Sequence, residues 1–488
     1  MDLAALVKDS QTVSDAWRGI EITGLTADSR DVAPGHLFAA LAGSRADGAR
    51  FIPDACERGA AAVLAGPRVS CADKLGVPLI RVDNPRRALA LAAARFYSRQ
   101  PDIMAAVTGT NGKTSVAAFL RQIWQRAGKS AASIGTIGIV ANGAVRPLLH
   151  TTPDPVALHR LLRELADGGV THAAMEASSH GLAQYRIDGV RFAAAGFTNL
   201  SRDHLDYHES FDDYLAQKLR LFREVIEADA AVVVNADCEH AEAVIATAEA
   251  RGIACATVGK RGATLKLTAH RRIELGQRLT IVDAEGGEHK VTLPLVGDFQ
   301  TANALLAAGL AIATGIDADD ALAALGHLEG AKGRLEKVAE PADGAAVFVD
   351  YAHTPDALKT VLETLRPYTK RRLIVVFGAG GDRDKGKRPL MGKIAARLAD
   401  IAIVTDDNPR SEDPAGIRAE ILAKAPEAIE IGDRRTAIAA GVRMLRAGDV
   451  LLVAGKGHEE GQILDDKTIP FSDHEAVLAA LEQVGHRG

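Results

Sequence analysis

The stretch from Ile103 to Ser115, IMAAVTGTNGKTS, places a glycine-rich loop between a buried-strand pattern and a helical pattern. Glycines let such a loop turn tightly and point its N–H groups at phosphate oxygens, and the helix N-terminus adds positive potential. Lys113 is expected to reach the outer phosphates of a nucleotide, and the Thr114 hydroxyl to coordinate Mg²⁺. Val107 stands where the full GxxxxGK[ST] pattern has its first glycine, so an ordinary glycine turn is the alternative.

Two acidic and histidine-rich clusters follow this loop, MEASSHG ending at Gly181 and TNLSRDHLDYH ending at His208. An enzyme that uses a magnesium nucleotide needs hard oxygen ligands, so Glu176, at an expected strand end, is a candidate. His204 is a less expected ligand, because imidazole is softer than Mg²⁺ prefers. A solvated polar loop is the alternative for the second cluster, and no zinc-binding pattern accompanies it.

The last third of the chain alternates apolar strand patterns with helical ones. The strand patterns are AAVFVD, RLIVVFG, IAIVT and VLLVAG. This alternation predicts a parallel sheet with right-handed crossovers. Each strand is followed by a polar or glycine-rich cluster, and ligands bind outside the carboxyl ends of strands in such sheets. The clusters are Asp350–His353, Gly378–Arg388, Asp406–Arg410 and Gly455–Glu459.

Other elements are expected upstream. A helix should end at Tyr97, a linker should surround Pro101, and a strand should end at Asn235. Short antiparallel strands are expected between 258 and 290, followed by an alanine-rich helix over 301–314.

The 488 residues suggest about three domains. The net charge of −5 argues against a general nucleic-acid binder, and the 47% hydrophobic content with only 4% aromatics suits helices packed on parallel strands. No long apolar run or basic leader occurs, so neither a membrane span nor a signal peptide is expected. The four cysteines form no CxxC pair, which favours free thiols in a reducing cytoplasm.

Taken together, the motifs resemble those of the Mur ligases, the ATP-dependent amide-forming enzymes of peptidoglycan precursor synthesis. The matching stretches occur in the family's order along essentially the whole chain. They are TGTNGKTS, EASSHGL, NLSRDHLDYH, GRLE at 333–336, VDYAHTPD, GAGGDRDKGKR and DNPR.

The resemblance implies an α/β chain of three domains. These are a uridine-nucleotide-binding domain over 1–100, a P-loop ATPase-like parallel sheet over 101–331, and a Rossmann-like amino-acid-binding domain over 332–488. The implied ATP-binding residues are Gly109, Thr110, Asn111, Gly112, Lys113, Thr114, Ser115, Asn303, Arg334 and Asp350, the last two after domain closure.

The resemblance also implies a UDP-N-acetylmuramoyl dipeptide as one substrate. Its expected contacts are Ala27, Ser29, Arg45, Ala46, Asp47, Thr151, Thr152, Ser178, Ser179, Gln184 and Arg186. Lys218 matches the family's carbamylated lysine, and a carbamate supplies oxygen ligands to a second Mg²⁺. The implied metal ligands are therefore Thr114, Glu176, His204 and carbamylated Lys218, and the implied catalytic residues are Lys113, Lys218, His204 and Glu176. A spectator lysine on a solvated helix is the alternative for Lys218.

The DNPR motif resembles that of members that add meso-diaminopimelate. The additional carboxylate of that amino acid suits a bidentate arginine. The implied contacts are Arg383, Asp407, Asn408, Pro409, Arg410, Gly455 and Glu459. Without the resemblance, DNPR is only a turn with a surface arginine.

The expected reaction forms an acyl phosphate from ATP, which the amine of diaminopimelate then attacks. We expect a monomer acting on small molecules only. Three alternatives stay open: an L-lysine-adding ligase of the same family, a folylpolyglutamate-synthetase-like ligase, and a nucleotide-dependent switch without ligase activity.

Overall fold

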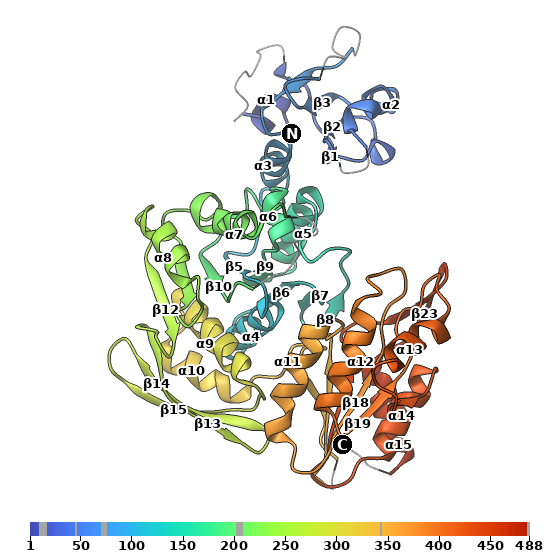
Figure 1. The fold of residues 1–488 in the computed structure, drawn as a ribbon. Helices are drawn as coiled ribbons and strands as arrows, with labels where there is room; N and C mark the ends of the chain where they lie inside the picture. The colour runs from blue at the N-terminus through green and yellow to red at the C-terminus, as the bar shows by residue number, and fades with distance from the viewer. Residues whose placement is uncertain (9–16, 44–45, 70–75, 202–207, 342–343, 486–488) are drawn as a thin grey trace. The chain divides into compact units, whose positions relative to one another are not determined.

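The computed structural model has N-terminal, central and C-terminal α/β domains, each with a parallel-sheet core (Figure 1). It describes residues 1–8, 17–43, 46–69, 76–201, 208–341 and 344–485. The chain forms two compact units. The first consists of Met1–Lys266 and Leu305–Ala321, and the second of Leu267–Ala304 and Leu322–Gly488.

The N-terminal domain is built on four parallel strands in the order β1-β2-β3-β4. The strands are β1 (Gly24–Thr26), β2 (His36–Ala40), β3 (Ala62–Ala65) and β4 (Leu79–Arg81). The helices are α1 (Leu3–Leu6), α2 (Ile52–Glu57) and α3 (Pro85–Tyr97). Alternate residues of β2 face two cores, with Leu37 in one and Phe38 in the other. The helix predicted to end at Tyr97 is confirmed as α3.

The central sheet contains the strand that opens the glycine-rich loop. Its strand order in the first unit is β12-β11-β10-β5-β9-β6-β7-β8. The strands are β5 (Ile103–Thr108), β6 (Ala131–Gly135), β7 (Gly138–Ala141), β8 (Ala144–Arg146), β9 (His172–Glu176), β10 (Ala194–Phe197), β11 (Ala231–Asn235) and β12 (Cys255–Gly259). The predicted strands starting at Ile103 and ending at Asn235 are confirmed as β5 and β11.

Helices cover both faces of this sheet, as its fully buried strands require. They are α4 (Lys113–Arg126), α5 (Pro155–Asp167), α6 (Ser179–Ala183), α7 (Phe211–Arg220) with a π-helical turn η5 (Leu221–Val225), α8 (Ala241–Glu249), and the later helices α9 (Asp298–Ala313) and α10 (Ala318–Ala324). On one face, Leu158 of α5 and Val244 of α8 share a core with Met175 of β9. On the other, Leu310 of α9 packs so closely on Gly196 of β10 that a Cβ there would lie 2.9 Å from it.

Three longer strands follow, β13 (Leu265–Ile273), β14 (Gly276–Asp283) and β15 (Glu288–Leu293). β14 and β15 pair antiparallel, which confirms the expectation for residues 258–290. The predicted alanine-rich helix is confirmed as α9, which begins a turn earlier than expected, at Asp298.

The C-terminal sheet has six strands in the order β16-β17-β21-β18-β19-β20. They are β16 (Glu336–Ala339), β17 (Ala346–Asp350), β18 (Leu373–Phe377), β19 (Ile401–Val404), β20 (Ile429–Glu430) and β21 (Val450–Ala454); β22 (Gly461–Leu464) and β23 (Lys467–Pro470) form a separate hairpin. All four strands predicted here are confirmed, and β17, β21, β18 and β19 are mutually parallel.

Helices lie on both faces of this sheet as well. They are α11 (Pro355–Leu365), α12 (Lys387–Leu398), α13 (Pro414–Leu422), α14 (Arg434–Arg443) and α15 (Asp473–Gln483). Leu452 of β21 packs in the core that contains Met391 of α12, whereas Leu451 and Val453 pack in the core that contains Ile438 of α14. Helices therefore cover both faces of the sheet, and the polar loops follow the carboxyl ends of its strands.

The second unit also includes residues that precede α9. Val296 belongs to the same core as Phe348 of β17. The Gly297 N–H donates to the Tyr368 hydroxyl at 3.2 Å, and Lys370 forms an ion pair with Glu274. The β14–β15 hairpin is thus tied to the C-terminal sheet within this unit.

Candidate active site

The glycine-rich loop connects the end of β5 to the first residue of α4, Lys113. Gly109 has a φ of 139° and Gly112 a φ of 87°, which glycine adopts far more readily than other residues. A Cβ on Gly109 would lie 1.9 Å from Oγ1 of Thr198. The loop therefore needs glycine at this position for space as well as for conformation.

Backbone and side-chain hydrogen bonds from β10 and the segment after it hold this loop. The N–H groups of Thr110 and Asn111 donate to the carbonyl and side-chain oxygens of Asn199, at 2.8 and 3.1 Å. The Thr198 hydroxyl donates to the Asn111 carbonyl at 2.6 Å. The Tyr214 and Thr110 hydroxyls are 3.0 Å apart. The predicted ligand His204 lies outside the described residues.

Two lysine side chains converge on one carbonyl of the loop. Lys113 Nζ donates to the carbonyls of Gly109 and Thr110 at 2.9 and 2.7 Å, and Lys218 Nζ donates to the same Gly109 carbonyl at 2.7 Å. Lys218 is 1% exposed, and its Nζ lies 4.3 Å from the centre of the Tyr214 ring.

Glu176 is the last residue of β9, as predicted, and its side chain is buried. One carboxylate oxygen accepts a hydrogen bond from Thr136 N at 2.7 Å, and the other from the Thr136 hydroxyl at 3.2 Å. Among the described residues, no lysine, arginine or histidine forms an ion pair with it. A buried carboxylate bonded only to neutral donors suits a hard cation, so Glu176 and the hydroxyl of Thr114 fit the preferences of Mg²⁺.

The position of Glu176 depends on a glycine in the neighbouring strand. A Cβ on Gly135 would lie 2.1 Å from Oε1 of Glu176. Gly135→Ala is therefore expected to displace the carboxylate and lower kcat by about 100-fold, the cost of misplacing a reacting geometry by about 1 Å. Steady-state ADP release checks this. Gly66→Ala, where the added Cβ meets open space, is the control; equal activity of the two variants would contradict the role of Gly135.

Most residues expected to contact the uridine nucleotide in the central domain lie together beside Glu176. Oγ1 of Thr152 donates to the Glu176 carbonyl at 3.0 Å and is 3.0 Å from the Ser178 hydroxyl. Arg186 donates to the Thr152 carbonyl at 2.7 Å and to Gln184 Oε1 at 2.8 Å. The hydroxyls of Thr151 and Thr136 are 3.1 Å apart, and Ser179 is buried with no hydrogen bond from its hydroxyl to a described residue.

The expected N-terminal contacts lie in short turns. Ser29 begins a 3₁₀ turn, η2 (Ser29–Asp31), directly after Ala27 and Asp28, and Asp47 caps a second turn, η3 (Gly48–Phe51), directly after Ala46. Hydrogen bonds from Arg30 hold the pKa of the Asp28 carboxyl at about 2. Arg45 lies outside the described residues.

In the second unit, hydrogen bonds through Gln300 connect two predicted ATP contacts, Asn303 and Arg334, and the charge of Arg334 acts on the third, Asp350. Asn303 donates to Gln300 Oε1 at 3.1 Å, and Gln300 donates to the Arg334 carbonyl at 3.4 Å. The Arg334 guanidinium lies 4.8 Å from the centre of the Tyr351 ring. Burial raises the pKa of Asp350 to about 6, although the Arg334 charge and hydrogen bonds from Leu335 N and Ala352 N oppose the shift.

The residues expected to bind the amino acid gather at the carboxyl ends of β19 and β21. Asn408 Nδ2 donates to Glu459 Oε2 at 2.9 Å. A Cβ on Gly455 would lie 2.5 Å from Oδ2 of Asp407, and that oxygen accepts no hydrogen bond from a described residue. Arg410, with an unusual positive φ of 53°, donates to the Gly381 carbonyl at 2.8 Å.

The other members of this group are placed differently. The buried Pro409 contributes its carbonyl, which a Cβ on Gly381 would approach to 1.9 Å. Arg383 is exposed, and no hydrogen bond or ion pair joins it to any described residue. The structure thus brings together Asp407, Asn408, Arg410, Gly455 and Glu459, and leaves Arg383 at the surface.

Several neighbours of these residues were not predicted. They are Thr136, Gln300, Tyr351 and Lys456. Lys456 lies in the predicted Gly455–Glu459 cluster and Tyr351 in the predicted Asp350–His353 cluster, whereas Thr136 follows Gly135, the last residue of β6, and no sequence pattern marked it. Nothing in the sequence indicated which partner each would meet.

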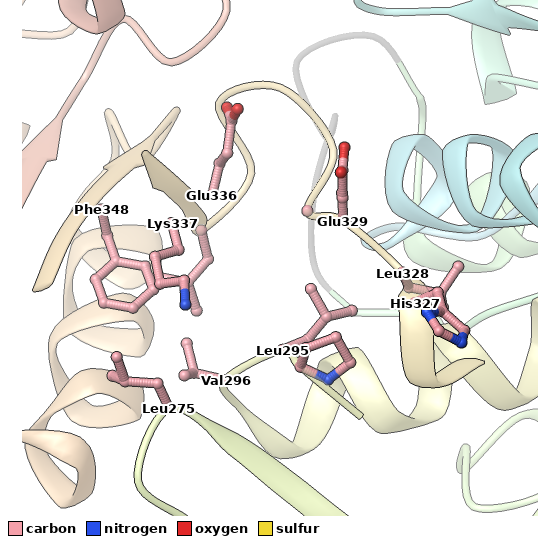
Figure 2. A pocket seen from close by; sticks show the side chains of 12 residues that line it. Leu275, Leu295, Val296, His327, Leu328, Glu329, Glu336, Lys337 and Phe348 are labelled. Carbon is pink, nitrogen blue, oxygen red and sulfur yellow. The ribbon is translucent and has the colours of Figure 1, made fainter. Parts of the chain in front are cut away.

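A cavity with a volume of about 350 Å³ lies in the second unit beside β16 (Figure 2). Leu275, Val296 and Phe348 supply apolar lining, while Glu329 and Glu336 turn their carboxylates away from these side chains (Figure 2). No predicted site residue lines it. In the described part of the chain, no cluster of three metal-binding His, Cys, Asp or Glu side chains occurs, and no helix is long and apolar enough to cross a membrane.

Comparison with known families gives three matches along the chain. Residues 21–97 match the Mur ligase family catalytic domain, residues 107–311 the Mur ligase middle domain, and residues 333–457 the Mur ligase glutamate ligase domain.

Curated relatives cover nearly the whole chain. A UDP-N-acetylmuramoyl-L-alanyl-D-glutamate–2,6-diaminopimelate ligase of Mesorhizobium japonicum is 57% identical over 99% of each chain. The ligase of the same name from Caulobacter vibrioides is 55% identical over 95% of this chain and 96% of its own.

Two solved structures are also similar to this chain. A ligase of that name is 32% identical, covers 100% of both chains and superposes with a TM-score of 0.74. A Mycobacterium tuberculosis folylpolyglutamate synthase complexed with ADP shares the fold. It is 19% identical and superposes with a TM-score of 0.62, and the match covers 82% of this chain and 94% of its own. On the strength of these matches, the chain belongs to the Mur ligase family.

Proposed function

We propose that the protein is an ATP-dependent ligase that adds meso-2,6-diaminopimelate to the γ-carboxylate of D-Glu in UDP-N-acetylmuramoyl-L-Ala-D-Glu. The names of relatives that are 57% identical over 99% of their length support this substrate pair. The observation that carries the choice of amino acid is the cluster of Asp407, Asn408, Arg410 and Glu459 at the strand ends. It combines carboxylates for ammonium groups with a guanidinium for a carboxylate.

The phosphate-activating residues belong to the first unit. The N-terminus of α4 suits the phosphates of ATP, and Lys113 offsets their charge. Thr114 and Glu176 would hold Mg²⁺, together with His204 and carbamylated Lys218 as the family resemblance implies. The metal would act as a Lewis acid on the phosphoryl oxygens. Asn303, Arg334 and Asp350 are the proposed ATP contacts of the second unit.

The proposed reaction has two steps. The γ-carboxylate of D-Glu attacks the γ-phosphorus of ATP, the bond from that phosphorus to the bridging oxygen breaks, and ADP leaves. The amine of diaminopimelate, having lost a proton, then attacks the acyl carbon, and inorganic phosphate leaves as the amide forms. Lys113 offsets the repulsion between the carboxylate and the phosphates in the first step.

The dipeptide nucleotide is assigned to the hydroxyl, amide and guanidinium groups beside Glu176. Thr152, Ser178, Gln184 and Arg186 form one hydrogen-bonded group there. This location suits a substrate carboxylate that must react near the ATP phosphates. Because ATP and a nucleotide sugar are the substrates, we assign the enzyme to the cytoplasm, and it is expected to act as a monomer.

A substrate comparison tests the proposal. ADP release is measured with the purified nucleotide dipeptide and meso-diaminopimelate, L-lysine, or no amino acid, and separately with a folate as acceptor. The proposal expects turnover with diaminopimelate. Preference for L-lysine would favour the lysine-adding ligase, turnover of folate would favour the folylpolyglutamate-type ligase, and ATPase activity indifferent to all of them would favour a nucleotide switch.

Arg410→Ala should weaken the use of diaminopimelate selectively. Loss of a charged hydrogen-bond pair to a carboxylate costs about 2–3 kcal/mol, which lowers kcat/KM for diaminopimelate by about 30- to 150-fold. Steady-state kinetics with diaminopimelate and ATP varied in turn measure this. The KM for ATP should stay close to that of the unmodified enzyme, and an unchanged KM for diaminopimelate would remove Arg410 from the amino-acid site.

A further inference from the structure

A buried lysine lies within the proposed amino-acid cluster. Lys456 follows β21 and is fully buried. Its Nζ donates to Asn408 Oδ1 at 2.9 Å and to Glu459 Oε2 at 3.2 Å. Burying an ammonium group costs free energy unless the group is paired. A buried lysine at this position therefore indicates a role in the amino-acid cluster.

Lys456 fixes the orientation of two side chains assigned to the substrate. Asn408 Oδ1 accepts from both Lys456 Nζ and Ile463 N, the latter at 3.0 Å, which leaves Nδ2 to donate to Glu459. Glu459 Oε2 thus receives two donors, while Oε1 accepts no hydrogen bond from a described residue. Oε1 is the oxygen left to receive a substrate ammonium.

The charge of Lys456 acts differently on the two candidate amino acids. Diaminopimelate carries two ammonium and two carboxylate groups and is net neutral, whereas lysine has one carboxylate fewer and is net positive. A buried cation beside the site repels the ammonium groups of both but attracts the additional carboxylate of diaminopimelate only. The nearby Arg434 contributes less, because both carboxylate oxygens of Asp473 pair with it at 2.7 and 2.8 Å, whereas Lys456 meets one oxygen of Glu459 at 3.2 Å.

We propose that Lys456 is a specificity-determining residue, which acts through Asn408 and Glu459 and through its charge to favour a net-neutral diamino dicarboxylate over a diamine with one carboxylate. The inference rests on the proposed function. Arg410 supplies attraction for the distal carboxylate, and Lys456 supplies repulsion against a ligand that lacks it. Specificity then has two sources at separate positions.

Two substitutions separate the charge of Lys456 from its hydrogen bonds. Lys456→Met removes both, and Lys456→Gln keeps a donor for Asn408 Oδ1 without the charge. kcat/KM is measured for meso-diaminopimelate and for L-lysine with each variant. The ratio of the two values should fall by about tenfold or more in both variants, because a unit charge at short range in a weakly screened site is lost. The KM for diaminopimelate should rise further in Lys456→Met than in Lys456→Gln.

Two controls make the result decisive. Val442→Ala opens a cavity in the core under α14 without touching the cluster, so it reports what destabilisation alone does to the ratio. ATP-dependent formation of the acyl phosphate from the nucleotide dipeptide should keep its KM for ATP in both Lys456 variants. It is followed as ADP release without an amino acid, while hydroxylamine attacks the acyl phosphate and releases inorganic phosphate. An unchanged ratio in Lys456→Gln, or an equal fall in Val442→Ala, would overturn the inference. An unmodified enzyme that does not prefer diaminopimelate would instead refute the proposed function.

Discussion

Lys113→Ala is expected to abolish ATP-dependent phosphate release. The Lys113 amine lies within 3 Å of two carbonyls of the glycine-rich loop, at the first residue of α4. No other side chain on that loop carries a positive charge, so alanine leaves the developing charge on the phosphates without its protein counterion. Removal of one such group typically costs about 100- to 1,000-fold in kcat, and the loss here should reach the upper end. Phosphate release with saturating substrates measures it.

Arg126→Ala is the matched control, because Arg126 is an exposed cation in the last turn of the same helix. It should leave kcat close to that of the unmodified enzyme. Thermal unfolding of both variants checks that α4 remains folded. Turnover retained in Lys113→Ala would refute the assignment of the loop to ATP.

Lys218→Ala is expected to lose most activity, by about 100-fold or more, and to regain part of it when a short carboxylic acid is supplied. The proposed carbamate would turn this buried amine into an anionic oxygen donor for Mg²⁺. A small carboxylate can occupy the space left by the truncated side chain and supply the same kind of oxygen. ADP release with and without the added acid measures the recovery, and mass spectrometry of the unmodified protein looks for the carbamate itself.

The alternative is that Lys218 acts as an ammonium that supports the Gly109 carbonyl, as its 2.7 Å hydrogen bond would allow. Lys218→Arg separates the two roles, since it keeps the charge but cannot form the carbamate. Activity in Lys218→Arg, or full activity in untreated Lys218→Ala, would contradict the carbamate. Lys113→Ala is the control for rescue, because a carboxylate cannot replace a cation.

Much of the fold could be predicted because its signals are local. The apolar runs ending at Thr108, Asn235 and Asp350 are buried on both faces, and such runs indicate central parallel strands wherever they occur. The order of the strands could not be read in the same way. β21 lies between β17 and β18, although it comes last of the three in the chain, and only tertiary packing determines that insertion.

The site was predictable to the extent that strand ends determine it. Glu176 could be located because it ends a strand, and Arg410 because it follows one. The pairing of Thr136 with Glu176 joins residues 40 positions apart, and that of Lys456 with Asn408 joins residues 48 apart. Contacts of this kind depend on which strands become neighbours, so no local pattern indicates them.

The close association of the β14–β15 hairpin with the C-terminal sheet limits how this enzyme can be recombined. A chimaera joined at residue 332 would separate Val296 from Phe348 and the Gly297 N–H from the Tyr368 hydroxyl. The last third of the chain therefore cannot be exchanged between relatives by itself without losing these contacts. A graft meant to transfer amino-acid selectivity between relatives would have to carry residues 267–304 along with the strands that bear Asn408 and Lys456.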